Sequence, residues 1–132
     1  MTSTAQPSPD HILELMAQRI EGVGLYRGTD LHHSRGVAVP PTLLGAWDWA
    51  RGKTRPDWRT RGNESLWDEF HAACFAALHR LAMHVADQPD APDWWPVGQL
   101  AWESHVVVVW GEFHTADEAV TAIRAAARGG DA

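Results

Sequence analysis

The stretch NESLWDEFHAACFAALHRLAMHVA, residues 63–86, decides the fold class of this chain. Its apolar residues recur at intervals of three and four, which is the period of an α-helix. The residues that cluster most tightly on one face are Trp67, Cys74, Leu78 and Val85. Asn63 suits the N-cap. A stripe this wide is typical of a helix with neighbours on several sides, so we expect it at the centre of the core.

Three further helices are marked by their ends. Ser8 and Pro9 suit the N-cap and the first helical position of a helix that stops near Gly24. A short helix is expected from Leu43 to about Gly52. Thr115 and Glu118 have the spacing of a capping box, which predicts a helix that stops at Gly129 and Gly130.

Two segments lack a clear helical period and predict strands. Residues 24–41 contain short apolar pieces around a polar stretch, which indicates a loose β-hairpin. Val106–Trp110 is the strongest strand signal, because β-branched residues favour a pleated, buried surface. We therefore expect a mainly α (α+β) fold of three to four helices with a small β-hairpin or a two- to three-stranded sheet. A strand with few partners also predicts a homodimer.

Length and composition suit one domain. The chain has 132 residues and is 45% hydrophobic, so residues 8–130 form a globular domain behind a disordered tail, residues 1–7. The single cysteine permits no internal disulfide, and no signal peptide is recognisable, which together predict a cytoplasmic location. The longest apolar run is far shorter than a membrane span, so no membrane association is expected.

Charge is distributed unevenly. Residues 51–61 carry five cations and one anion, a local net charge of +4 within a chain of net charge −6, so the remainder sums to −10. Tryptophans are interleaved with these cations, and Trp and Arg are enriched at interface hot spots. We therefore expect a non-enzymatic binding or regulatory module that contacts another protein through a Trp/Arg-rich loop. The predicted binding residues are Trp47, Trp49, Arg51, Arg55, Trp58, Arg59, Arg61, Trp94 and Trp95.

Two other interpretations of the basic loop stay open. Its cations can pair within the chain with nearby acids such as Asp48, Asp57 and Asp93, which leaves a solvated cationic face. They can also bind nucleic acid or a phosphorylated ligand, although the net charge of −6 argues against a polyanion.

The eight tryptophans divide into two groups. Trp67, Trp102 and Trp110 have apolar neighbours and are expected in the core. The others lie in or beside loops, as two sets of opposite local charge, residues 47–58 and 94–95. These sets either pack against each other or present an exposed aromatic patch.

Metal and catalytic sites have weaker support. His71 and Cys74 are three apart, a spacing that can place both on one metal, and His32 and His33 are the only other obvious donors. The alternative is a hydrogen-bonded His71 beside a buried, inert Cys74. Nucleotide-binding and hydrolase motifs are absent, so we expect no cofactor and no catalytic residue. A small-ligand or metal-binding enzyme with a pocket lined by Trp and His remains the alternative.

The order Trp110, turn, Thr115, Glu118 and an apolar 120–127 segment resembles the W-N-D…R-T…E-V…L…A-A ending of a family of uncharacterised small actinobacterial proteins. The N-terminal piece is similar too, with an amphipathic helix that runs into Gly24–Gly28 and a loop with histidines, so the resemblance covers about half of the chain. Gly111 and Glu112 depart from the pattern, since they stand where that family has Asn-Asp. The resemblance implies a compact, mostly helical cytoplasmic domain and no particular chemistry.

Overall fold

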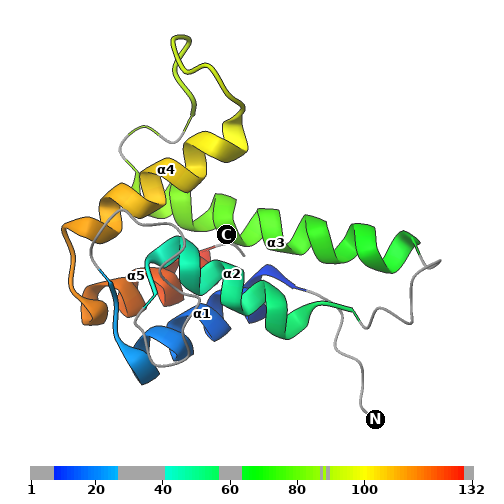
Figure 1. Cartoon of the computed structure of the whole chain (residues 1–132), viewed down its shortest axis with the longest axis horizontal. Helices are drawn as coiled ribbons and strands as arrows, with labels where there is room; N and C mark the ends of the chain where they lie inside the picture. The colour runs from blue at the N-terminus through cyan, green and yellow to red at the C-terminus, as the bar shows by residue number, and fades with distance from the viewer. Residues whose placement is uncertain (1–7, 27–40, 57–63, 87, 89, 130–132) are drawn as a thin grey trace.

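The computed structural model describes residues 8–26, 41–56, 64–86, 88 and 90–129. These residues form five helices and no strand (Figure 1). The helices are α1 (Pro9–Val23), α2 (Leu43–Thr54), α3 (Glu64–Val85), α4 (Gln99–Glu112) and α5 (Ala116–Gly129). The prediction of an α+β fold with three to four helices and a small sheet is therefore wrong for this part of the chain. The predicted tail at 1–7, most of the predicted hairpin (27–40) and the N-cap Asn63 lie outside the described residues.

Several predicted helix ends are confirmed by their hydrogen bonds. Ser8 Oγ accepts a hydrogen bond from the His11 N–H at 3.1 Å, as an N-cap should. At the other end of α1, Gly24 has a φ of 91°, a left-handed value that glycine adopts readily. Thr115 and Glu118 form the complete capping box, with reciprocal N–H to side-chain distances of 2.8 and 3.2 Å.

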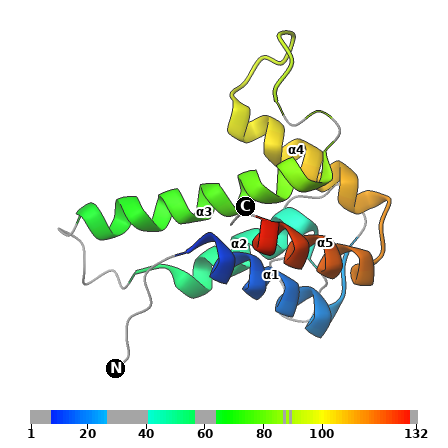
Figure 2. The same ribbon diagram turned by 180° about the vertical axis from the view of Figure 1, so that it is seen from behind.

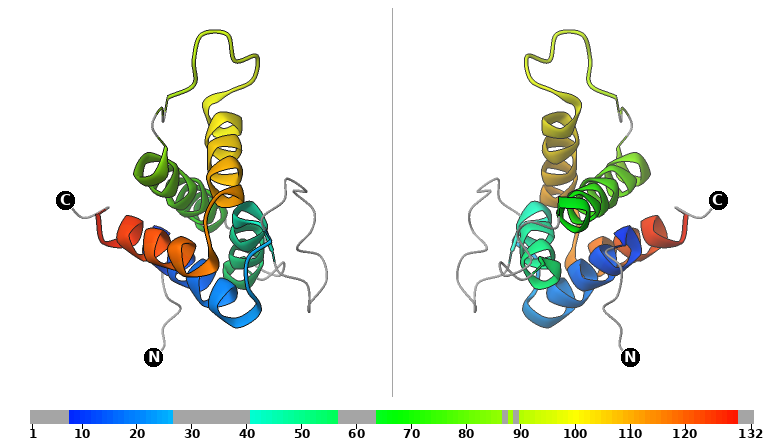
Figure 3. Two further views of the ribbon diagram at one scale, coloured as in Figure 1. Left: turned by 90° about the vertical axis from the view of Figure 1, so that its left-hand side faces the viewer. Right: turned by 90° about the vertical axis from the view of Figure 1, so that its right-hand side faces the viewer.

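The helices are arranged around α1 and α3. Helices α1 and α5 lie side by side, and α3 packs against all four other helices (Figures 1 and 2). Helix α4 crosses α3 on the side away from α5, and its N-terminal half projects from the body together with the segment that leads into it (Figure 3). Helix α4 as a whole packs mainly against α3 and α2.

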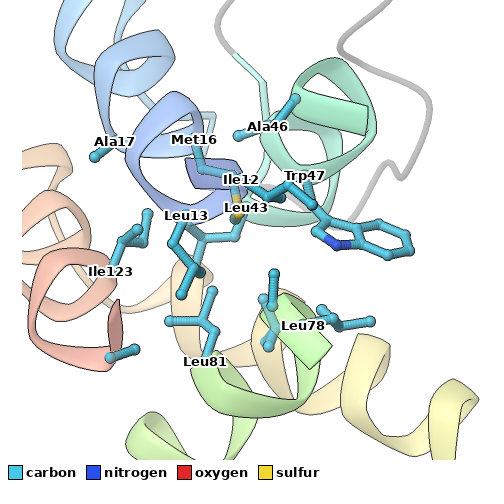
Figure 4. Close-up of a cluster of buried hydrophobic side chains, with 14 of the residues drawn as sticks. Ile12, Leu13, Met16, Ala17, Leu43, Ala46, Trp47, Leu78, Leu81 and Ile123 are labelled. Atoms are coloured by element: carbon cyan, nitrogen blue, oxygen red, sulfur yellow. The ribbon is translucent and has the colours of Figure 1, made fainter. Parts of the chain in front are cut away.

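The core lies where the five helices of the described residues meet. Ile12, Leu13 and Met16 of α1 are completely buried (Figure 4). They pack in one cluster with side chains of the other helices, including Leu43, Leu78, Leu81 and Ile123. Burial of each such side chain contributes about 1.5–3 kcal/mol, so this cluster is the main stabilising element of the fold.

The segment Val106–Trp110, predicted as a strand, lies inside α4. The buried residues of α4 are Trp102, Glu103, Val107, Val108 and Gly111, which recur with a helical period. Valine is less favourable than alanine in a helix by at most about 0.7 kcal/mol, and burial of a valine side chain outweighs that cost. The argument for a homodimer from an unpaired strand is lost with the strand.

Gly111 allows α4 to approach α2 closely. An added Cβ at this position would lie 3.2 Å from Leu43 Cδ1 and 3.3 Å from Leu43 Cγ, closer than ordinary van der Waals contact. The small residue therefore fixes how near the C-terminal half of α4 sits to the start of α2.

Among the described residues, none of the five helices combines the length and the apolar character that a membrane-spanning helix needs.

Candidate functional site

The first part of the predicted basic loop is helical. Helix α2 continues to Thr54, so Arg51 and Lys53 belong to its last turns, where cations are favoured by the helix dipole. The Arg51 guanidinium lies over the Trp47 ring, 4.4 Å from its centroid, and donates a hydrogen bond to Asp48 at 3.2 Å. Arg51 therefore already has partners within its own helix.

The tryptophans of α2 are also engaged within the chain. Trp47 is only 5% exposed, and its Nε1 donates a hydrogen bond to the Cys74 carbonyl of α3 at 2.8 Å. Trp49 is half-buried, with the cations of Arg19 and Lys53 at 5.0 and 5.4 Å from its ring. These contacts favour an intramolecularly paired basic segment.

The remaining predicted residues of that segment are either exposed or undescribed. Arg55 follows α2 and is exposed to solvent. Trp58, Arg59 and Arg61 lie outside the described residues, as does Asp57.

The second predicted set of tryptophans forms a different kind of surface. We define the tryptophan loop as residues 88–98, between α3 and α4. Trp94 in this loop is 72% exposed, yet its ring contacts Trp95 and Trp102 edge to face, with centroids 6.1 and 6.0 Å apart. Trp95 and Trp102 lie 5.0 Å apart, and His105 packs beside both at 5.4 and 5.5 Å. We call these four side chains the tryptophan cluster.

Hydrogen bonds hold the tryptophan loop onto α4. Trp102 Nε1 donates to the Gln88 carbonyl at 2.9 Å, and Trp95 Nε1 donates to the Gly98 carbonyl at 3.2 Å. The Ala91 N–H donates to Gln99 Oε1 at 2.7 Å. The indole N–H groups of Trp95 and Trp102 therefore both have acceptors. These two rings support the exposed ring of Trp94.

A buried carboxylate connects this loop to α3. Glu103 is 4% exposed, and its Oε2 accepts hydrogen bonds from Gln99 Nε2 at 2.9 Å and from His79 Nδ1 at 2.6 Å. Gln99 in turn holds Ala91, so the chain of contacts runs from α3 through α4 to the tryptophan loop. Burial of a carboxylate is costly unless it is hydrogen-bonded, and these two donors supply that compensation.

An apolar groove adjoins the tryptophan cluster. It has a volume of about 510 Å³ and lies between the start of α2 and the exposed face of α4. Its lining consists of Leu44, Trp95, Ala101, Ser104, His105, Val108 and Val109. The volume falls within the range of small-molecule and side-chain pockets, and the lining offers few polar groups. The groove therefore suits an apolar side chain or an apolar ligand.

The two loop sets of tryptophans do not meet directly. In the described part of the chain, no ring contact joins Trp47 or Trp49 to Trp94 or Trp95, and the two sets approach only where Leu44 of α2 shares the groove with Trp95. Of the three tryptophans predicted in the core, Trp102 is buried. Trp67 and Trp110 are half-buried and pack against the hydrophobic core cluster.

The structure separates the two described members of the weak metal site. Cys74 is completely buried in the core, whereas His71, three residues earlier, is exposed and packs between the rings of Trp67 and Phe75. Burial raises the pKa of the Cys74 thiol above its usual value, which disfavours the thiolate that metals bind. His32 and His33 lie outside the described residues. Among those described, no three His, Cys, Asp or Glu side chains are placed to hold a metal ion.

Fold and site together define an all-helical domain, in its described part, that carries a projecting aromatic surface. The chain belongs to a family of unknown function, DUF6197, which it matches over residues 4–129. This confirms the expectation of an uncharacterised domain family. Neither the curated proteins nor the solved structures include a match to this chain.

The residues that support the tryptophan loop were missed by the sequence prediction. They are His79, Gln99 and Glu103, together with the groove residues Val108 and Val109. The available signal was the spacing of Gln99 and Glu103, which places both on one face only if the segment is helical. The valines at 106–109 that follow predicted a strand, so the helical spacing of Gln99 and Glu103 was not recognised.

Proposed function

We propose that this chain is a binding module that recognises another protein through the tryptophan loop and the apolar groove. The observation that carries the proposal is Trp94. It exposes 72% of its surface although its ring is braced by Trp95 and Trp102. Exposed tryptophans on an ordered support are the side chains that most often dominate protein interfaces, because little conformational entropy is lost when they are buried.

Neighbouring residues extend the same surface. Val97 and Leu100, three and six residues after Trp94, are also exposed large apolar side chains. The groove beside Trp95 offers a recess of about 510 Å³ for an anchoring side chain of the partner. Exposed apolar side chains and an apolar recess in one region of the chain favour an interaction site.

The proposal moves the binding surface away from the basic segment. Arg51 and Lys53 lie against tryptophans of their own helix, so they contribute less to an external contact than the sequence suggested. Of the predicted binding residues, Trp94 and Trp95 keep the leading role. A non-enzymatic activity in the cytoplasm remains part of the proposal, since a single buried cysteine suits a reducing compartment.

A matched pair of variants tests the proposal. Trp94 and Phe113 are equally exposed, at 72%, and Phe113 follows α4 at its opposite end. A photo-crosslinking phenylalanine analogue is placed at either position in the full chain, which is expressed in its native cells. We expect a discrete crosslinked protein from position 94 that position 113 does not give. Equal crosslinking from both positions, or none from position 94, would contradict the proposal.

Binding of a small apolar ligand in the groove is a second candidate function. It is favoured by the groove's volume and by its nearly apolar lining around Val108 and Val109. Native mass spectrometry of the purified chain would show a co-purified small molecule, which Val108→Trp should displace by filling the groove. A bare mass for the wild-type chain would count against this candidate.

A further inference from the structure

The segment that carries the tryptophan loop is free of cations. Residues 81–123 contain seven acidic side chains, Asp87, Asp90, Asp93, Glu103, Glu112, Asp117 and Glu118, and no Lys or Arg. Two of these acids, Asp90 and Asp93, lie within the tryptophan loop and are exposed. The projecting surface is therefore aromatic and anionic at once.

Two arginines outside this segment form ion pairs with carboxylates of α1. Arg80 pairs with Asp10 of α1, and Arg124 of α5 bonds both Glu14 and Glu21. Within the described residues, no ion pair joins Asp90 or Asp93 to a cation. Their charge is available to a partner.

From this charge pattern we infer that the partner presents a cationic amphipathic segment, with apolar side chains on one face and Lys or Arg on the other. The inference rests on the proposed function and specifies the chemistry of its partner. An apolar side chain of the segment enters the groove beside Trp95. Its cations lie over the exposed face of Trp94 and beside Asp90 and Asp93, where cation–π and Coulombic attraction act together.

The aromatic geometry excludes a different use of the same tryptophans. Cages that enclose a quaternary ammonium hold their rings apart around the ion. Here the centroids of Trp94, Trp95 and Trp102 are only 5.0–6.1 Å apart, so the rings contact one another and leave no space between them. A cation can instead lie on the exposed face of Trp94. Nucleic acids and anionic membranes share the sign of Asp90 and Asp93 and are repelled.

Three synthetic peptides test the inference. Each has about 16 residues and the same Leu/Ala apolar face, while the polar face carries Lys, Gln or Glu. Affinity is measured by titration of the full chain, with tryptophan fluorescence as the signal. Because an exposed ion pair contributes modestly, we expect the Lys peptide to bind about threefold to tenfold more tightly than the Gln peptide, and the Glu peptide to bind most weakly. Raising the salt concentration from about 0.1 M to about 1 M should abolish the difference.

Two double variants show whether the preference comes from this loop. Asp90→Asn with Asp93→Asn should bring the Lys and Gln peptides to equal affinity. Asp68→Asn with Glu69→Gln removes two exposed carboxylates of α3 and the same net charge, and it should leave the Lys preference unchanged. Loss of the preference in the α3 variant would reduce it to an effect of overall charge and would overturn the inference.

The outcomes separate this inference from the proposed function. If the Lys and Gln peptides bind equally and both lose affinity in Trp94→Ala, the surface binds protein but does not select cations, and the inference is wrong. If the Lys peptide binds wild type and Trp94→Ala equally well, its contact lies elsewhere, and the inference is also wrong. Failure of all three peptides to bind rejects a cationic amphipathic partner, while crosslinking from position 94 reports on the proposed function independently.

Discussion

The hydrogen bond between His79 and Glu103 predicts that substitution of the exposed histidine destabilises the fold more than substitution of the buried carboxylate. Glu103 is 4% exposed, whereas 52% of the His79 side chain is exposed. Removal of His79 leaves a buried carboxylate with one donor fewer. Removal of the carboxylate leaves His79 and Gln99, both of which water can reach.

The magnitudes follow from that difference. Loss of a donor to a buried carboxylate costs about 1–3 kcal/mol, so His79→Ala should destabilise the fold by that amount. Glu103→Leu replaces the carboxylate by an apolar side chain of similar size. Because replacement of a buried ionic group by a packed apolar one is often neutral, we expect a change within about 1 kcal/mol. The larger effect should therefore come from the more exposed residue.

Urea unfolding followed by tryptophan fluorescence measures the effect. For a small domain the dependence of stability on urea is about 1–3 kcal/mol per M, so a loss of 2 kcal/mol lowers the midpoint by about 1 M. Glu103→Gln keeps one acceptor oxygen for His79 and serves as the control. Its urea midpoint is expected between those of Glu103→Leu and His79→Ala. A Glu103→Leu variant that is less stable than His79→Ala would refute the reasoning, since it would mean that the carboxylate itself stabilises the fold.

Three further predictions concern the remaining elements. Gly111→Ala should lower the melting temperature although alanine favours a helix by about 1 kcal/mol, because its Cβ would press on Leu43 at 3.2 Å; a rise in melting temperature would show that the leucine yields easily. Hydrogen bonding from Arg124 lowers the pKa of Glu14, a contribution that is present at neutral pH and is lost as the pH falls below the usual value near 4.5. Arg124→Met should therefore be less stable than wild type at pH 7 and should differ less at pH 3, and a constant difference in urea midpoint would contradict this linkage. The buried Cys74, whose thiol pKa is raised by burial, should react with a disulfide reagent at least about 100-fold more slowly in the native chain than in urea, and equal rates would be inconsistent with its position.

Sequence patterns predicted best those elements whose ends are set by local hydrogen bonds. The cap at Ser8 and the capping box of Thr115 and Glu118 involve residues three apart, so composition and spacing suffice. The run 106–109 failed because β preference reflects packing in a pleated surface, and the described residues contain no partner strand. Tertiary burial of Val107 and Val108 decided the conformation there, and burial is not visible in a short apolar run.

The candidate site was predicted only in part, for a related reason. Tryptophans next to charged residues were singled out as binding residues, but sequence alone could not tell which of them pack within the chain. Trp47 reaches the Cys74 carbonyl across 27 residues of sequence, and only the packing of α2 on α3 shows this contact. Trp94 differs because 72% of its surface is exposed and no acceptor among the described residues bonds its indole N–H.

The tryptophan loop depends on contacts with the fold, whereas the fold depends little on Trp94. Trp102 of α4 bonds Gln88, and Gln99 bonds Ala91, so residues of the fold hold the tryptophan loop in place. Trp94 contributes little to the stability of the fold, because most of its surface faces water and it is not part of the central core cluster. Trp94→Ala should thus cost about 1–3 kcal/mol, the sum of its two edge-to-face contacts, while it removes the centre of the proposed interface. A substitution at Trp94 should therefore affect stability less than one at Trp102, which is buried and anchors the loop.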